Sequence, residues 1–171
     1  DVKRLHTVTE RFSKIGSQPE MKSENLALAL KNTAAYMRPR ISKQVELELV
    51  GCDTDTSLTA QFNPSLLSWV LENLLRNAVD AMEGKGKITL SLTTKRDKAI
   101  IDVEDTGKGI LRSDIRNVFT PGFTTKKRGW GLGLSLTKRI IEEYHGGSIS
   151  LLRSEPGVGT TFRIILSRDG K

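Results

Sequence analysis

The sequence has one cysteine, two histidines and few aromatic residues, and each scarcity excludes a class of protein. Cys52 has no partner for an internal disulfide and no spacing fits a zinc site, so neither a disulfide scaffold nor a thiolate metal centre is expected. With 5% aromatic residues, the chain has few rings on which nucleic-acid bases could stack. No apolar run approaches the roughly 18 residues of a membrane helix, and the first ten residues are too polar for a signal peptide.

The length of 171 residues allows one full domain with a small additional segment, and excludes two large domains. Lys plus Arg number 27 against 20 Asp plus Glu, a net charge of +7. A basic balance suits nucleic acid, but it equally suits a nucleotide, a phosphorylated partner or an acidic protein surface. Because no RNA-binding aromatic signature and no zinc-finger spacing accompany the charge, we expect no nucleic-acid partner.

Residues 1–15 carry Leu5, Val8, Phe12 and Ile15 at the spacing of one helical stripe, and residues 16–19 end that helix. The stripe needs an apolar partner, which is either another helix of a bundle or the rest of the same domain. Both interpretations are open at this point.

Hydrophobic periodicity predicts helices and strands in mixed order over the rest of the chain. The first of these helices is expected to begin at Ser23 as its N-cap. The first two strands are expected to pair as a hairpin, and the third and fourth strands are expected to form a second hairpin. This mixture predicts an α+β fold, a two-layer α/β sandwich whose mixed, mostly antiparallel sheet is covered by helices. The expected helices span 23–37, 63–82 and 132–145, and the expected strands span 45–49, 58–62, 88–92, 101–105, 148–154 and 160–167.

The expected helix 63–82 begins at Asn63 as N-cap with Pro64 in its first turn. Its apolar residues fill one broad arc, and Asn73, Asn77 and Asp80 form a narrow polar stripe at the edge of that arc. Two amide oxygens one turn apart could hold a magnesium ion that binds mainly phosphate and water. Two solvated amides would give the same pattern, so the stripe alone does not distinguish a magnesium site from a solvated helix edge.

Eleven of the fifteen glycines lie between Gly107 and Gly170, so the second half needs unusual backbone. Asp105 ends a predicted strand, and Gly107 and Gly109 follow it. A carboxylate there could accept a hydrogen bond from the amino group of a base, and the glycines would let a flat ligand approach the backbone. An Asx-type turn is the alternative.

The glycine run 129–133 is not one of the common phosphate loops. A dinucleotide fingerprint would need glycine where Leu134 stands, and the Gly-Lys-Ser/Thr of a P-loop does not occur. What remains is glycine-rich backbone before the helix 132–145, whose N-terminal amides can receive phosphate. A plain surface turn is the alternative.

Taken in order, these motifs resemble those of the ATP-binding catalytic domain of sensor histidine kinases. Residues 73–81 resemble the N box, 105–110 the G1 box, 119–123 the F box and 129–134 the G2 box of that family, and 157–162 its terminal Gly-Thr-Thr-Phe element. The resemblance covers about residues 20–168. Residues 1–19 are similar to the second helix of the family's dimerisation hairpin, so the implied domains are 1–19 and 20–171.

The resemblance implies a Bergerat ATP-binding fold with three helices on the sheet, and ATP and Mg²⁺ as ligands. It implies Asn77 as the magnesium ligand, Asp105 as the acceptor for the adenine amino group, and Asn73 and Lys126 as catalytic residues. The implied ATP-binding residues are Asn77, Asp105, Gly107, Gly109, Ile110, Phe119, Lys126, Gly129, Gly131, Leu132, Gly133, Leu134 and Thr161.

Two positions depart from relatives of this family. Asp80 stands where many members have a lysine, so either another group neutralises phosphate or Asp80 faces water. Asn73 stands where ATP-hydrolysing relatives carry a glutamate base, and Glu72 lies about 100° round the helix from it. Poor water activation favours a kinase that presents the γ-phosphoryl group to a separate nucleophile.

The resemblance therefore implies a protein-histidine kinase fragment of a two-component system. Its phosphoacceptor would be a histidine on a dimerisation helix, and neither His6 nor His145 has that context. The implied partners are that helix, a response regulator and a second copy of the full-length protein, and the implied location is the cytoplasmic part of a membrane sensor. An ATPase of the same superfamily and a nucleotide-gated interaction module without transfer are the alternatives.

Overall fold

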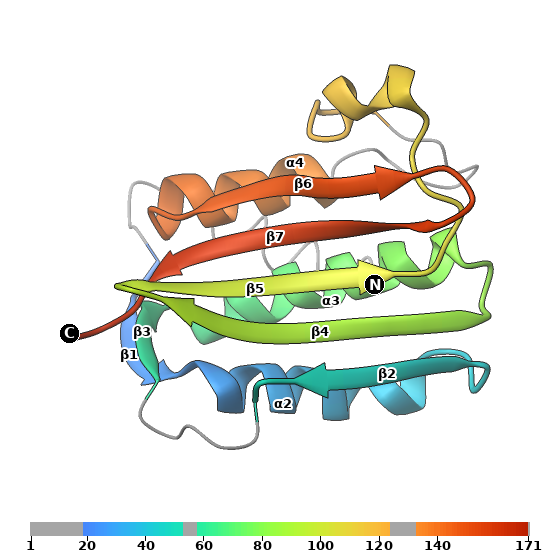
Figure 1. Cartoon of the computed structure of the whole chain (residues 1–171). Coiled ribbons are helices and arrows are strands. Elements are labelled where there is room, and N and C mark those ends of the chain that lie inside the picture. Colours follow the sequence, from blue (N-terminus) through green and yellow to red (C-terminus); the bar gives the residue numbers. More distant parts are fainter. Residues whose placement is uncertain (1–18, 53–57, 124–132, 171) are drawn as a thin grey trace.

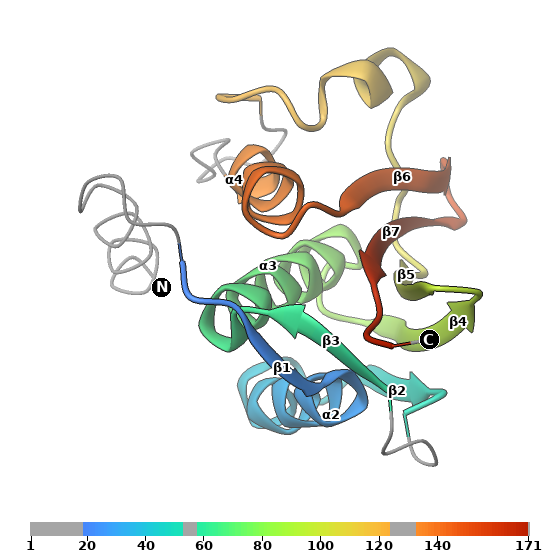
Figure 2. The ribbon, with the colours of Figure 1, turned by 90° about the vertical axis from the view of Figure 1, so that its left-hand side faces the viewer.

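The computed structural model describes residues 19–52, 58–123 and 133–170. Five of its strands form one mixed sheet, and three helices cover one face of that sheet (Figure 1), as the view turned by 90° also shows (Figure 2). This confirms the predicted α+β two-layer architecture. The helices are α2 (Leu26–Met37), α3 (Pro64–Ala81) and α4 (Gly133–Arg139), and the strands are β1 (Lys22–Asn25), β2 (Val45–Val50), β3 (Thr59–Phe62), β4 (Gly86–Lys95), β5 (Lys98–Asp105), β6 (Ser148–Glu155) and β7 (Gly159–Ser167).

Strand order in the large sheet is β2-β4-β5-β7-β6, with β2 parallel to β4 and every other pair antiparallel. The predicted hairpin of β4 and β5 is confirmed, and it sets Ile88 opposite Asp105. The predicted hairpin of β2 and β3 is wrong, because β2 pairs with β4 while β3 pairs with β1 in a separate two-stranded sheet. Alternation along a strand reports which face is buried, and it carries no information about the neighbouring strand.

Strand β1 was not predicted, because its sequence, Lys-Ser-Glu-Asn, has no apolar alternation and its side chains are mostly exposed. Pairing with β3 fixes it, and so Ser23 is a strand residue that donates a hydrogen bond to Asp169. The N-cap of α2 is Asn25, whose Oδ1 accepts from the Leu28 amide at 2.7 Å, and not Ser23 as predicted. Both residue types cap helices well, so sequence alone left the start of α2 uncertain by two residues.

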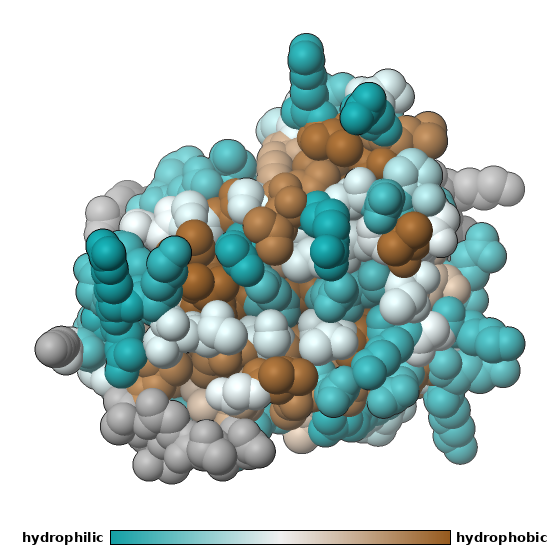
Figure 3. Space-filling view, viewed as in Figure 1, coloured by the Kyte–Doolittle hydropathy of each residue, from teal (hydrophilic) through white to brown (hydrophobic). Residues whose placement is uncertain are grey.

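The core lies between the helices and the covered face of the sheet, where Leu67, Val70, Leu71, Ile88 and Ile101 are fully buried. The opposite face of the sheet is not covered by a helix (Figure 1), and hydrophilic, intermediate and hydrophobic residues are mixed on it (Figure 3). No helix in the described part of the chain is long and apolar enough to cross a membrane.

Two short helical turns extend the regular elements. A 3₁₀ turn, Arg112–Asn117, follows β5, and a π-helical turn, Ile140–Tyr144, continues α4. The end of β5, the C-terminal half of α3 and the start of α4 lie toward the same end of the molecule (Figure 1).

Candidate functional site

The polar stripe of α3 is present as predicted. The helix begins at Asn63, whose Oδ1 accepts from the Leu66 amide at 3.0 Å, with Pro64 in the first turn. Asn73 and Asn77 are half-buried one turn apart, and Asp80 is exposed. The exposure of Asp80 agrees with the second of the two alternatives above, in which this side chain faces water.

Asn73 and Asn77 offer neutral amide oxygens as metal ligands on α3. In the described part of the chain, no three His, Cys, Asp or Glu residues gather as a metal cage. Mg²⁺ takes oxygen ligands and keeps several waters and phosphate oxygens when it binds with a nucleotide. A single amide oxygen such as that of Asn77 therefore fits a phosphate-bound Mg²⁺ better than a free ion.

Asp105 lies at the end of β5 with 7% of its surface exposed. Its Oδ1 accepts a hydrogen bond from the Gly107 amide at 2.8 Å. Burial raises the pKa of this carboxyl, while hydrogen bonds from the backbone amides of Gly107 and Thr160 oppose that shift. A carboxylate has about four acceptor sites, so two amides leave capacity for a further donor from a ligand.

Protein contacts alone already require glycine at positions 107 and 109, and their predicted role in admitting a base stays a prediction. A Cβ on Gly107 would lie 2.7 Å from the Ala81 carbonyl, and a Cβ on Gly109, whose φ is +77°, would collide with the Glu155 backbone. The Lys108 amide also donates to the Ala81 carbonyl at 3.0 Å. These glycines let the loop pack against both α3 and the β6–β7 turn.

A short chain of hydrogen bonds joins the loop after Asp105 to strands β6 and β7. The Ile110 amide donates to Ser154 Oγ at 2.8 Å, and Ser154 Oγ lies 2.8 Å from Thr160 Oγ1. Thr160 is opposite Asp105 in the β5–β7 register. Thr160 and Ser154 were not predicted as site residues.

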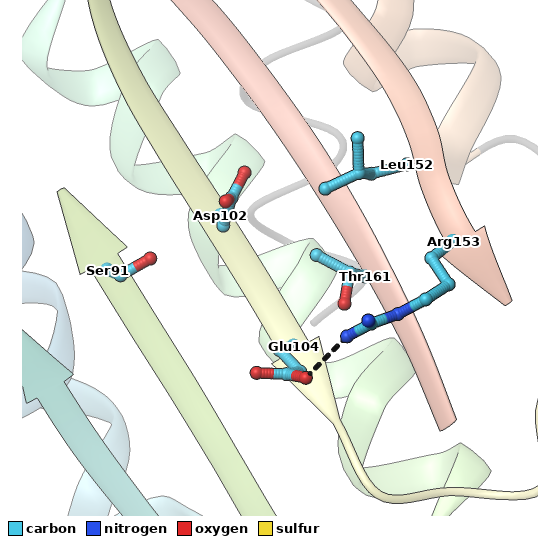
Figure 4. Close-up of a pocket in the computed structure, with 6 residues that line it drawn as sticks. All are labelled: Ser91, Asp102, Glu104, Leu152, Arg153 and Thr161. Atoms are coloured by element: carbon cyan, nitrogen blue, oxygen red, sulfur yellow. Dashed lines mark hydrogen bonds and ion pairs between the residues drawn. The ribbon is translucent and has the colours of Figure 1, made fainter. Parts of the chain in front are cut away.

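The predicted role of Thr161 is corrected by its orientation. Thr161 is opposite Glu104 in the register, and its side chain lines a concavity of about 320 Å³ on the uncovered face of the sheet (Figure 4). An ion pair of 3.0 Å between Arg153 and Glu104 borders that concavity. Asp105 faces the helices, so a base held by Asp105 lies on the other side of the sheet from Thr161, and Thr160 is the threonine near it.

Phe119 anchors its segment through its ring. Its ring makes an edge-to-face contact with Phe162, with centroids 6.0 Å apart and planes at 79°. The Lys138 ammonium lies 5.2 Å from the centroid of the Phe119 ring. The contact ties the segment after the 3₁₀ turn to β7 and α4, and contact with a nucleotide stays a prediction.

The N-terminus of α4 lies directly against the polar stripe of α3. A Cβ on Gly133 would be 2.7 Å from Asn73 Oδ1, and Asn73 Nδ2 donates to Thr137 Oγ1 at 3.2 Å. Leu134 is partly buried against the core. The structure thus brings Asn73, Asn77 and the end of the glycine run together, whereas Lys126, Gly129, Gly131 and Leu132 lie outside the described residues.

His145 is half-buried and makes two hydrogen bonds within the protein. Its Nε2 accepts from the Asn63 amide at 3.1 Å, so its proton is on Nδ1, which lies 2.9 Å from the Ile140 carbonyl oxygen. Burial lowers the pKa of this imidazole below 6.5. His6 lies outside the described residues.

Comparison with known sequences identifies the family of this chain. Residues 62–170 match the family "Histidine kinase-, DNA gyrase B-, and HSP90-like ATPase". The sensor histidine kinase ZraS of Salmonella typhi is 40% identical over 126 residues, which is 73% of this chain and 26% of ZraS. Sporulation kinase D of Bacillus subtilis is 33% identical over 171 residues, which is 97% of this chain and 33% of that kinase.

Solved structures show the same fold. The nucleotide-free catalytic domain of histidine kinase ThkA has a TM-score of 0.77 at 27% identity, covering 87% of this chain and 96% of that one. ThkA in complex with the response regulator protein TrrA has a TM-score of 0.76 at 24% identity, covering 98% of this chain and 48% of that one.

The chain thus spans a quarter to a third of the length of the two curated kinases that it matches. The family match covers residues 62–170, which is more than half of the chain. The chain belongs to the histidine kinase-, DNA gyrase B- and HSP90-like ATPase family, as the ATP-binding domain of a sensor histidine kinase.

Proposed function

We propose that this domain binds Mg-ATP and transfers the γ-phosphoryl group to a histidine on a partner segment. The observation that carries the proposal is Asp105, a buried carboxylate held at the end of β5 by the Gly107 amide. It keeps acceptor capacity for the 6-amino group of adenine, and guanine presents a carbonyl oxygen at that position, which a carboxylate would repel. The site therefore favours ATP over GTP.

Asn77 and the N-terminus of α4 are the groups proposed for the phosphate end of the nucleotide. The Asn77 amide oxygen would hold a Mg²⁺ ion, which when bound neutralises phosphate charge. The amides in the first turn of α4 would favour anionic oxygens. Lys126, Gly129, Gly131 and Leu132 are proposed to contribute from the segment before α4.

The reaction itself needs positioning more than covalent chemistry from this domain. A histidine imidazole nitrogen forms a bond to the γ-phosphorus as the bond to the bridging oxygen breaks, and ADP leaves with the electron pair. Hydrolysis is disfavoured because Asn73, at the position of the water-activating base, is an amide that donates to Thr137. Glu72 is buried, with 5% exposure, on a different part of the helix surface.

The partners follow from the family and stay proposals. We propose that residues 1–19 belong to a dimerisation hairpin and residues 20–171 to the ATP-binding domain. The phosphoryl group would pass from the hairpin histidine to a response regulator, the kind of partner with which ThkA has been solved. The domain would act in the cytoplasm as part of a dimeric membrane sensor.

Two measurements test this function. Calorimetric titration with ATP, with and without Mg²⁺, is expected to show magnesium-dependent affinity, and GTP is expected to bind more weakly. Radiolabelled ATP is then incubated with this chain and a separately made histidine-bearing hairpin. Acid-labile label on the hairpin supports the kinase.

The alternative functions predict different results in the same two experiments. Binding of ATP at saturation without any label on the hairpin would support a nucleotide-gated module. Rapid release of inorganic phosphate that is lost in Glu72→Gln would support an ATPase. Absence of magnesium-dependent ATP binding would refute all three.

A further inference from the structure

Thr137 is a fully buried polar residue on α4 that the proposed mechanism does not use. Its exposure is 0%, and its Oγ1 accepts a hydrogen bond from Asn73 Nδ2 at 3.2 Å. A valine has nearly the same shape and would be the simpler choice at an apolar helix contact. The hydroxyl therefore matters for its hydrogen bond rather than for its volume.

The same asparagine contacts α4 at a second point. The Cα of Gly133 packs so closely on Asn73 that an added Cβ would lie 2.7 Å from Oδ1 and 3.0 Å from Nδ2. Gly133 and Thr137 are one helical turn apart, about 6 Å along the axis of α4. The Asn73 side chain thus contacts both ends of the first turn of α4. These two contacts limit the sliding and the rotation of α4 against α3.

We propose that Thr137 is a positioning residue for phosphoryl transfer. Its hydroxyl holds the first turn of α4 in register with the face of α3 that carries Asn73 and Asn77. The inference rests on the proposed function and adds to it a residue that touches neither ATP nor Mg²⁺.

The expected consequence is on the rate rather than on folding. Asn77 lies one turn beyond Asn73, and α4 begins at the last glycine of the run proposed to hold the phosphates. A shift of α4 by a fraction of its turn would move its amides relative to Asn77. Misplacement by about 1 Å can slow a reaction by about 100-fold when catalysis depends on positioning.

Two substitutions separate the hydroxyl from the shape of the side chain. Thr137→Val keeps the shape and removes the acceptor, and it is expected to slow transfer to the hairpin at saturating Mg-ATP by about 10-fold or more. Thr137→Ser keeps the hydroxyl and removes a methyl group, so it is expected to transfer within about 2-fold of the wild type and to unfold at lower temperature. The order of the rates is thus opposite to the order of the stabilities, which a purely structural residue would not produce.

Thr33 on α2 provides the matched control. It is also a buried helical threonine, with 3% exposure, and its Oγ1 has no hydrogen-bond partner among the described residues. Thr33→Val is expected to transfer at the wild-type rate. The same change at two buried threonines therefore differs only in the loss of the bond to Asn73.

A double-mutant cycle gives a second test that does not depend on one variant. Because Thr137→Val acts through Asn73, adding it to Asn73→Ala is expected to slow transfer no further. Additive slowing, or a Thr137→Val enzyme as fast as the wild type, would overturn the inference while leaving the kinase intact. A wild-type chain that binds ATP without labelling the hairpin would instead refute the proposed function.

Discussion

Replacing Asp105 by asparagine separates nucleotide binding from stability more sharply than any other change in the site. The carboxylate meets donors from the Gly107 and Thr160 amides and, in the proposed complex, from the adenine amino group. Asparagine has one acceptor oxygen and an NH₂ group, so at least one of these donors would face another donor. A hydrogen bond to a charged group contributes about 1.5–3 kcal/mol, so we expect the Kd for Mg-ATP to rise by roughly 10- to 150-fold.

Stability is expected to change in the opposite direction. Burial raises the pKa of Asp105 above 3.8, so the unfolded chain releases this proton at lower pH than the folded one. The contribution of the group is therefore most favourable below the unfolded pKa, decreases as pH rises through the folded pKa, and stays unfavourable at pH 7. Neutral asparagine removes that penalty, and the melting temperature of Asp105→Asn at pH 7 should equal or exceed that of the wild type.

Calorimetry and thermal unfolding of three proteins test this prediction. Asp102→Asn is the control, because Asp102 lies three residues earlier on β5, faces the uncovered side and pairs with Arg163 at 2.8 Å. It should bind Mg-ATP like the wild type. The reasoning fails if Asp105→Asn binds within about 3-fold of the wild type, or if both variants lose binding equally.

Three further predictions concern other parts of the site. Asn77→Ala should abolish the difference in ATP affinity between titrations with and without Mg²⁺, and a difference that persists would remove Asn77 as the magnesium ligand. Gly133→Ala should slow transfer to the hairpin even though alanine favours a helix by up to about 1 kcal/mol, because its Cβ would displace the Asn73 amide; a wild-type rate would show that this contact is unimportant. The pKa of His145 is lowered below 6.5, so the unfolded chain takes up the proton first, and the free energy of unfolding should be constant above about pH 6.5 and fall as pH drops below it. Protonation adds a hydrogen to Nε2, which can then no longer accept from the Asn63 amide. Urea unfolding measured between pH 5 and 8 should show the fall in the wild type and not in His145→Gln.

The parts of the fold that sequence predicted are those fixed by local patterns. The cap at Asn63 and the apolar arc of α3 depend on residues within one helix, and the β4–β5 hairpin depends on two adjacent strands. The pairing of β2 with β4 brings together strands that are separated by β3 and α3, and burial of the whole sheet decides it. Strand β1 has no pattern of its own and exists through its partner β3.

The site was predicted to the level of the motif and missed at the level of the single side chain. Sequence can locate Asp105, because it ends a strand, and Asn77, because it lies at the edge of the apolar arc of a helix. The choice between Thr160 and Thr161 depends on the face of β7. Phe162, Ile164 and Leu166 are buried and alternate with the half-buried Arg163 and Ile165, and Thr160 lies on the same face as the buried set. Thr137 was missed because a threonine on an apolar helical arc looks like packing until its partner on another helix is known.

The contact between Asn73 and α4 also bears on why the domain would transfer phosphate rather than hydrolyse ATP. A water-activating base must leave one acceptor directed at water near the γ-phosphate. Here the amide at that position donates to Thr137 and is pressed against Gly133, so it is both without a basic atom and already engaged. A glutamate at position 73 would be longer by a methylene group in a space where Gly133 leaves none, so replacing the residue alone would displace α4 rather than create a base. On the proposed function, slow hydrolysis would then follow from how α3 and α4 pack, and not from the residue at position 73 alone.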